Sequence, residues 1–146
     1  MSASLAVTAL GIEFQNPILL AAGTAAYGRE LADVMPLESL GGFVTKAVSL
    51  EKRSGAPAPR VADFPGGMIN AVGLANPGVD GVLAEDLPWI ATHVRRPRVL
   101  VNVVGREAAD FGAVVRVDRL VTQLDQCGAK PAAVLGEDGD AGAGVG

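Results

Sequence analysis

Runs of consecutive apolar residues recur along the chain, and each is followed by a segment in which apolar residues have helical spacing. The runs cover residues 18–22, 43–45 and 99–104, and the helical segments cover residues 29–40, 79–87 and 111–124. Continuous apolar runs are typical of strands that are covered on both faces. Strands that alternate with helices predict parallel βα units, so the predicted fold class is α/β.

Turn and helix-breaking residues divide these elements. Pro36 interrupts the helix predicted over residues 29–40, because proline lacks the amide hydrogen that a helix interior needs. Asn76 and Pro77 predict the start of the next helix, with asparagine as the cap and proline at the first helical position. The pair Gly23-Thr24 predicts a turn after the first strand.

Two further segments have less regular patterns. Residues 5–7 and 12–14 flank Gly11 and predict a short N-terminal hairpin. Residues 49–76 contain several prolines and glycines and predict a long loop. Loops of that length inside a compact domain are often functional.

Two architectures fit this order of elements, a (β/α)8 barrel and an open doubly wound sheet. No Gly-x-Gly-x-x-Gly sequence follows the first predicted strand, which favours the barrel. A complete barrel takes about 250 residues, whereas this chain has 146. We therefore predict the N-terminal part of a TIM barrel, incomplete, over residues 1–125, and a low-complexity, disordered tail over residues 126–146. Because such a barrel leaves sheet edges open, the isolated chain is predicted to fold poorly, aggregate or depend on a partner.

Composition narrows the classes of function. The net charge is −4 and there is no long basic run, so no nucleic-acid partner is predicted. No apolar run approaches the roughly 20 residues that span a bilayer, and no secretory signal pattern is present. The single cysteine, Cys127, cannot form an internal disulfide, and the single histidine, His93, has no clustered ligands for a metal site. These features predict a soluble cytoplasmic protein without a bound metal.

Polar residues follow each of the three predicted strands. Thr24 comes after the first, Lys46 after the second, and Asn102 late in the third. In a parallel barrel these positions gather at the carboxyl ends of the strands, where active sites lie. A buried lysine stem requires an anion or several acceptors near its ammonium, unless the side chain reaches solvent. A buried asparagine amide requires a partner, either neighbouring backbone or the polar edge of a ligand ring.

The loop sequence over residues 67–78 is the most informative segment. Asn70 and Asn76 flank Gly73 and Leu74 in an otherwise apolar stretch. Glycines let the backbone turn its amide hydrogens outward, and asparagine side chains both donate and accept hydrogen bonds. This segment therefore predicts binding of a small, planar, polar ligand.

These motifs occur together in one known family. From about residue 5 to residue 115 the chain resembles the N-terminal portion of class 1 dihydroorotate dehydrogenases, and the Asn-Ala-Val-Gly-Leu form with Leu-Pro-Trp downstream is most similar to the NAD-linked subgroup. The matching motifs, in conserved order and spacing, are Asn16-Pro17, Ala22-Gly23-Thr24, Gly42-Phe43-Val44-Thr45-Lys46, Pro57-Ala58-Pro59-Arg60, residues 67–78, Leu87-Pro88-Trp89 and Asn102-Val103-Val104-Gly105.

The resemblance implies oxidation of dihydroorotate to orotate with hydride transfer to FMN, in pyrimidine biosynthesis. By position it implies FMN contacts from Thr24, Lys46, Ala47 and Asn102. It implies substrate contacts from Lys46, Asn70, Ala71, Val72, Gly73 and Leu74. It also implies an oligomer and, for the NAD-linked subgroup, a separate electron-transfer subunit with FAD and an iron–sulfur cluster.

The chain departs from the family pattern in two places. Ala56 stands where the family has asparagine, and the sequence after Val115 lacks the Asn-x-Ser-Cys-Pro-Asn loop that carries the family's cysteine base. Cys127 is outside such a motif, so no catalytic residue is assigned, and the chain is expected to be a truncated or frameshifted fragment. Two alternatives stay open: a non-catalytic remnant that binds a flavin or pyrimidine, and a related flavin-dependent dihydropyrimidine dehydrogenase.

Overall fold

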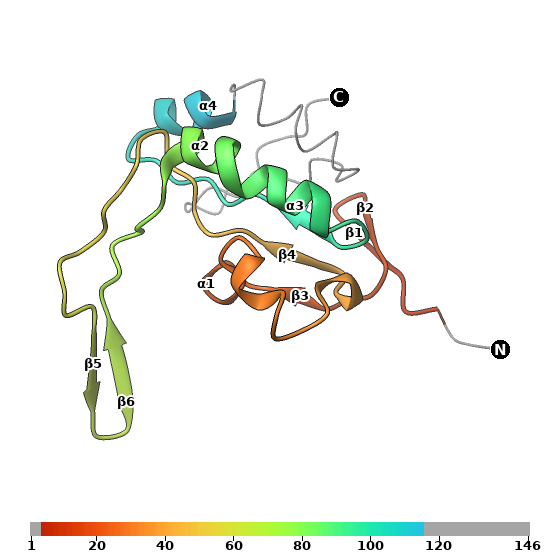
Figure 1. The fold of residues 1–146 in the computed structure, drawn as a ribbon, viewed down its shortest axis with the longest axis horizontal. Coiled ribbons are helices and arrows are strands. Elements are labelled where there is room, and N and C mark those ends of the chain that lie inside the picture. Colours follow the sequence, from red (N-terminus) through yellow and green to blue (C-terminus); the bar gives the residue numbers. More distant parts are fainter. Residues whose placement is uncertain (1–3, 116–146) are drawn as a thin grey trace.

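The computed structural model describes residues 4–115 and shows a mixed α/β arrangement around a small parallel sheet (Figure 1). The sheet has the order β3-β4-β7, formed by β3 (Leu19–Leu20), β4 (Gly42–Val44) and β7 (Arg98–Leu100). Both neighbouring pairs are parallel, with Leu20 opposite Phe43 and Phe43 opposite Val99. The prediction of parallel βα units is confirmed, and all three strands end at the same edge of the sheet.

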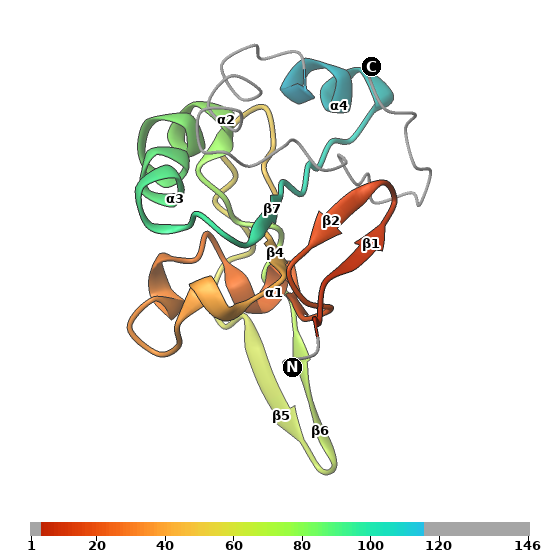
Figure 2. The same cartoon turned by 90° about the vertical axis from the view of Figure 1, so that its right-hand side faces the viewer.

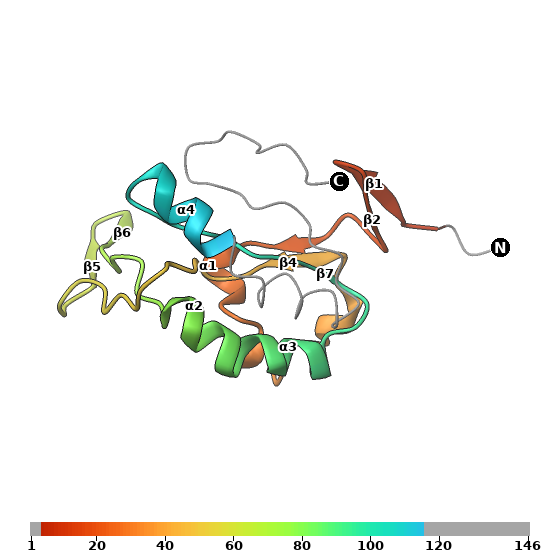
Figure 3. The same ribbon diagram turned by 90° about the horizontal axis from the view of Figure 1, so that it is seen from above.

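Helices pack against this sheet and form the core. α2 (Gly78–Gly81) continues through one π-helical turn (Val82–Asp86) into α3 (Leu87–His93), and Figure 3 shows this continuous helix along one side of the sheet. α4 (Ala108–Val115) follows β7. The side chains buried between helix and sheet are mainly aliphatic and include Phe43, Val82, Leu87, Ile90, Val99 and Val114.

The structure corrects the first predicted βα unit. The strand predicted over residues 18–22 is shorter, because α1 (Ala22–Ala25) begins at Ala22, and Gly23-Thr24 lies in this helical turn rather than in a loop. The helix predicted over residues 29–40 is wrong: two 3₁₀ turns, Arg29–Leu31 and Leu37–Ser39, occupy its place. Pro36 has an extended backbone (ψ 96°) between them, since its ring and missing amide hydrogen oppose a continuous helix.

The loop predicted over residues 49–76 contains a hairpin. β5 (Val61–Phe64) and β6 (Gly67–Asn70) pair antiparallel around Pro65-Gly66, and all eight strand residues are exposed. Figures 1 and 2 show this hairpin projecting from the body of the molecule, and we call residues 53–76 the arm. The sequence pattern did not predict this hairpin, because its apolar residues, such as Phe64, face solvent. Apolar alternation predicts a strand when one face of that strand is buried.

The remaining boundaries differ by a few residues. β1 (Val7–Ala9) and β2 (Ile12–Phe14) confirm the N-terminal hairpin, with its first strand two residues later than predicted. The run over residues 99–104 forms β7 only to Leu100, and Val103 then makes a single parallel bridge with Val48. The helix predicted over residues 111–124 begins earlier, at Ala108, and its part beyond Val115 lies outside the described residues, as do Cys127 and the predicted tail.

Among residues 4–115 no helix combines the length and the hydropathy needed to cross a membrane.

Candidate functional site

The ends of β4 and β7 place two of the predicted site residues next to one another. The hydroxyl of Thr45 accepts a hydrogen bond from the Asn102 main-chain amide at 3.2 Å and donates one to the Lys46 carbonyl oxygen at 3.0 Å. The Asn102 carbonyl oxygen in turn accepts from the Val48 amide at 2.8 Å. The predicted proximity of Lys46 and Asn102 is therefore observed, and the Thr45 hydroxyl maintains it by bonding to main-chain groups of both residues.

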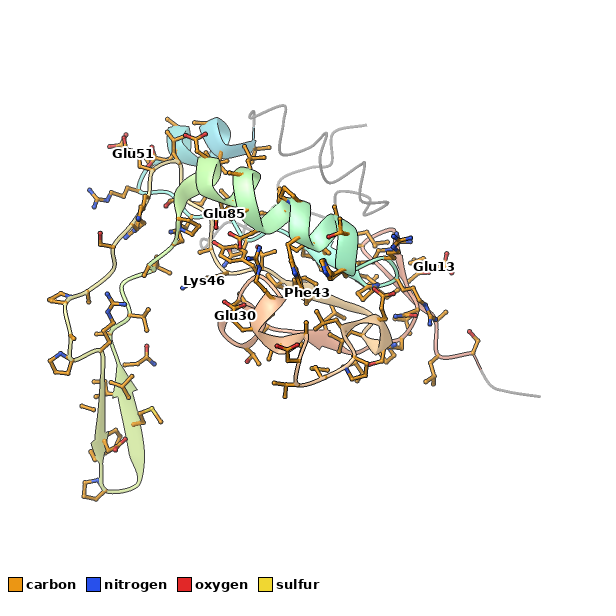
Figure 4. The ribbon with its side chains drawn as sticks, in the orientation of Figure 1. Glu13, Glu30, Phe43, Lys46, Glu51 and Glu85 are labelled. Atoms are coloured by element: carbon orange, nitrogen blue, oxygen red, sulfur yellow. The ribbon has the colours of Figure 1, made fainter. Side chains whose placement is uncertain are left out.

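Among residues 4–115 the side chains of Lys46 and Asn102 make no hydrogen bond. Both residues are half-buried, because each lies past the regular end of its strand. Within residues 4–115 their hydrogen bonds are made by main-chain atoms, including a 2.7 Å bond from the Lys46 amide to the Ala26 carbonyl oxygen. In Figure 4 Lys46 extends toward the side of the molecule from which the arm departs.

The segment after β3 contributes Thr24, which is exposed on α1. α1 packs against β4, and the Lys46–Ala26 hydrogen bond fixes the residue that follows this helix. Thr24, Lys46 and Asn102 therefore all follow strands of one parallel sheet, as predicted. No hydrogen bond within the described residues joins Thr24 to the other two.

Ala47 is held in place by a tyrosine. Its side chain is buried, and its carbonyl oxygen accepts a hydrogen bond from the Tyr27 hydroxyl at 3.2 Å. Burial raises the pKa of Tyr27, and the nearby carboxylates of Asp86 and Glu30 raise it further. The phenol therefore stays protonated at physiological pH and keeps its role as a donor.

The predicted substrate loop, residues 70–74, lies in the second leg of the arm. Its backbone is paired with the first leg: the Ala71 amide donates to the Arg60 carbonyl oxygen at 2.8 Å, and the Val72 carbonyl oxygen accepts from the Ala56 amide at 3.0 Å. Gly73 has a φ of 73°, and a Cβ there would lie 2.6 Å from the Ala56 nitrogen. Only glycine fits this position, because a side chain would break the pairing of the two legs.

Basic side chains surround an open hollow at the base of the arm. Its volume is about 290 Å³, and its lining residues are Lys52, Arg53, Ser54, Gly55, Gly73 and Arg106. Three cations around a small polar hollow beside Gly73 favour an anionic group. No sequence pattern predicted this grouping, because Arg106 comes from the segment after β7 and the other lining residues come from the arm and its approach.

Two further residues, to which no direct ligand contact was assigned, also shape the site. Thr45 is buried and joins β4 to the segment after β7, although the sequence suggested only a strand residue. Asn76 is buried and makes four side-chain hydrogen bonds at the base of the arm.

His93 is the last residue of α3 and stacks on Trp89, with ring centroids 4.5 Å apart. Within residues 4–115 no group of three histidine, cysteine or acidic side chains is arranged to hold a metal ion.

Comparison with known proteins identifies one family. The sequence model described as "Dihydroorotate dehydrogenase" matches residues 4–124. "Dihydroorotate dehydrogenase A (fumarate)" of Lactiplantibacillus plantarum is 43% identical over 112 residues, which are 77% of this chain and 37% of that protein. "Dihydroorotate dehydrogenase B (NAD(+)), catalytic subunit" of Pelobacter propionicus is 41% identical over 121 residues, 82% of this chain and 39% of that protein. The protein of the same name from Anoxybacillus flavithermus is 46% identical over 112 residues, 77% of this chain and 35% of that protein. The chain thus spans less than two fifths of the length of these relatives.

Proposed function

Because the chain belongs to the dihydroorotate dehydrogenase family, we propose that it is part of an enzyme that oxidises dihydroorotate to orotate in pyrimidine biosynthesis. One observation carries the proposal. Lys46 and Asn102 lie beside one another at the carboxyl ends of adjacent parallel strands, with side-chain donors that no described residue uses. Active sites of α/β proteins are built at this end of the sheet.

The proposed architecture is the first part of a (β/α)8 barrel, within a domain over residues 1–125. Support comes from the parallel order β3-β4-β7, in which each strand of the sheet pairs with the sheet strand that follows it in the sequence. The helical segment α2–α3, which lies between β4 and β7 in the sequence, packs against the sheet, as in a βα unit (Figure 3).

FMN is the proposed cofactor, held by Thr24, Lys46, Ala47 and Asn102. The donor set fits the polar edge of a flavin ring, because a half-buried ammonium and a half-buried amide can meet it. Ala47 is buried and is included by its position in the family motif alone. FMN supplies hydride-accepting chemistry when bound. Lys46 would place a fixed positive charge beside the ring, where negative charge develops during the reaction.

Residues 70–74, together with Lys46, are proposed to hold the substrate. Dihydroorotate has a carboxylate and an imide edge, which suit the side-chain amide of Asn70 and the main-chain amides of Gly73 and Leu74. These two residues have positive φ (73° and 53°), and their amides donate no hydrogen bond within the described residues. The basic hollow beside Gly73 adds positive charge around the same loop. No catalytic base is assigned, since Cys127 is not in the family's cysteine motif.

The electron acceptor is proposed to be a separate subunit with FAD and an iron–sulfur cluster. Several of the similar proteins are named as NAD(+)-type catalytic subunits, and this chain has one cysteine, too few to ligate a cluster. The competing electron acceptor is fumarate, which is part of the name of the relative from Lactiplantibacillus plantarum. Steady-state assays with fumarate, and with NAD⁺ plus the partner subunit, separate the two, and turnover with fumarate alone would refute the subunit proposal.

The primary test is flavin binding followed by reduction. Purified chain is titrated with FMN by fluorescence quenching, and dihydroorotate is then added without oxygen. We expect FMN to bind and its absorbance to bleach, and we expect Lys46→Ala to weaken FMN binding about tenfold. Arg95→Ala, at an exposed basic residue that precedes β7 and so lies at the opposite edge of the sheet, is the control and should leave FMN affinity within about twofold.

Three outcomes would contradict the proposal in different ways. Absence of FMN binding, or equal binding by Lys46→Ala, would remove the cofactor site. Bound FMN that dihydroorotate does not bleach would favour a non-catalytic flavin- or pyrimidine-binding protein. Reduction of uracil with a nicotinamide donor would instead favour a dihydropyrimidine dehydrogenase.

A further inference from the structure

The side chain of Asn76 connects three segments at the base of the arm. It is only 5% exposed, and its Oδ1 atom accepts hydrogen bonds from the Ser49 amide (3.2 Å), the Ser49 hydroxyl (3.0 Å) and the Gly78 amide (2.9 Å). Its Nδ2 atom donates to the Leu74 carbonyl oxygen at 2.9 Å. All of the polar atoms of this buried amide are therefore used, and they link the segment after β4, the substrate loop and the start of α2.

The main chain of Asn76 reinforces the same junction. It pairs with Arg53 in both directions, with the Arg53 amide 2.9 Å from the Asn76 carbonyl oxygen and the Asn76 amide 3.0 Å from the Arg53 carbonyl oxygen. At its base the arm is therefore joined through Asn76 to the segment after β4 and to the start of α2.

The hydrogen bond to Leu74 has a conformational consequence. Leu74 has a φ of 53°, in the left-handed region, which costs a non-glycine residue on the order of 1 kcal/mol or more. A strained backbone persists only where its surroundings hold it. The Asn76 Nδ2 atom supplies that restraint by binding the carbonyl oxygen of the strained residue.

We propose that Asn76 is a positioning residue for the substrate loop, holding Leu74 in its left-handed conformation so that the main-chain amides of Gly73 and Leu74, which donate no hydrogen bond within the described residues, are ready to bind the substrate carboxylate. This inference rests on the proposed function of the loop. Asn76 itself is buried and touches no substrate. Its effect is to remove the conformational cost of ordering the loop when the substrate binds.

The substitution Asn76→Asp removes this donor, and it also adds a negative charge at a position that is 5% exposed. It preserves the size of the side chain and the oxygen that accepts from Ser49 and Gly78, but it replaces the donor to Leu74 with an oxygen that repels the carbonyl. Ser49→Ala is the matched control, since it removes a buried hydroxyl bonded to Asn76 while leaving the Asn76–Leu74 bond in place. Asn76→Asp loses the bond to Leu74, and Ser49→Ala loses the contacts of its hydroxyl with Asn76 and with the Glu51 carbonyl oxygen.

Orotate and FMN affinities are measured for the wild-type chain and both variants. We expect Asn76→Asp to weaken orotate binding about tenfold, the loss typical of one hydrogen bond left unmade in a buried site, with FMN affinity within about twofold. Ser49→Ala should leave both affinities within about twofold. Equal orotate binding by Asn76→Asp would overturn the proposal, and so would parallel loss of FMN and orotate, which indicates a general structural role.

A second measurement needs no variant and no ligand. Hydrogen exchange of asparagine side-chain amides is followed by NMR in the wild-type chain, with exposed Asn70 as the internal reference. The Asn76 Nδ2 protons should exchange at least about tenfold more slowly than those of Asn70. Equal exchange rates would overturn the positioning role. If the wild-type chain bound neither FMN nor orotate, the proposed function would fail, and this exchange ratio alone would decide whether Asn76 restrains Leu74.

Discussion

The Thr45 hydroxyl is the acceptor of a 3.2 Å hydrogen bond from the Asn102 amide, and this bond joins two residues 57 positions apart in the chain. Thr45 is 1% exposed, so the bond is made where water cannot replace it. It positions Asn102 beside Lys46 without using either side chain. The relative placement of the two proposed FMN contacts thus depends on a residue that is proposed to touch neither cofactor nor substrate.

Thr45→Val removes this hydroxyl while keeping the shape of the side chain. The Asn102 amide and the Lys46 carbonyl oxygen would each lose their partner, and a buried group without a partner costs about 1–3 kcal/mol. We expect the free energy of unfolding in urea to fall by that amount and FMN affinity to fall with it. Thr92→Val, at an exposed threonine on α3, is the control and should change stability by less than about 0.5 kcal/mol.

Tyr27→Phe tests the support of Ala47. The variant keeps the buried ring and removes the donor to the Ala47 carbonyl oxygen, so we expect a loss of about 1–2 kcal/mol in thermal or urea unfolding. Since burial raises the pKa of Tyr27, the phenol is neutral over the whole physiological range, and the stability difference between wild type and variant should be constant between about pH 6 and pH 9. A difference that shrinks toward pH 9 would contradict this account.

Two glycines provide opposite expectations for the same substitution. A Cβ at Gly41 would lie 1.9 Å from the Asn16 carbonyl oxygen, beside the bond from the Gly41 amide to Ile18. Gly41→Ala should therefore destabilise the chain by about 3 kcal/mol or more, because the backbone of a neighbouring segment must move. A Cβ at Gly23, in α1, meets no atom within 4 Å, so Gly23→Ala should be neutral or stabilise by up to about 1 kcal/mol. Melting temperatures of the two variants would decide this, and similar values would contradict it.

The elements predictable from sequence are those whose apolar pattern corresponds to burial. Phe43 and Val99 lie in continuous apolar runs and are buried in adjacent parallel strands, so the order of the sheet followed from the pattern. The arm could not be predicted from the apolar pattern, because Val61, Phe64 and Ile69 face solvent. Their alternation carries no information about which face of the hairpin is covered. The helix over residues 29–40 failed because Leu37 and Leu40, three apart, are buried equally well by a 3₁₀ turn.

The candidate site was likewise predictable only in part. Lys46 and Asn102 were predicted to be neighbours because polar residues at the ends of parallel strands share one edge of the sheet. The bonds that fix them were not predictable, since Thr45 is joined to Asn102 across 57 residues and Asn76 to Ser49 across 27. Such contacts depend on side-chain orientation across packed segments, which periodicity does not encode.

A last prediction concerns Asp86, at the end of the π-helical turn that leads into α3. Burial raises the pKa of Asp86; the Arg29 guanidinium opposes this shift, and the Glu85 and Glu30 carboxylates add to it. The folded chain therefore keeps the Asp86 proton at pH values where the unfolded chain has lost it. Below the ordinary aspartate value of 3.8 both states are protonated, and as the pH rises from there to the raised pKa, the contribution of this group to stability declines.

Asp86→Asn removes this penalty, because the amide is neutral at every pH. We expect the variant to be more stable than the wild type at pH 7 and the advantage to disappear toward about pH 3.5, where the wild-type carboxyl is also neutral. Unfolding by urea at a series of pH values, with Asp80→Asn on exposed Asp80 as control, measures the difference directly. A variant less stable at pH 7 would mean that attraction between Asp86 and Arg29 outweighs burial, and the direction of the pKa shift would then be reversed.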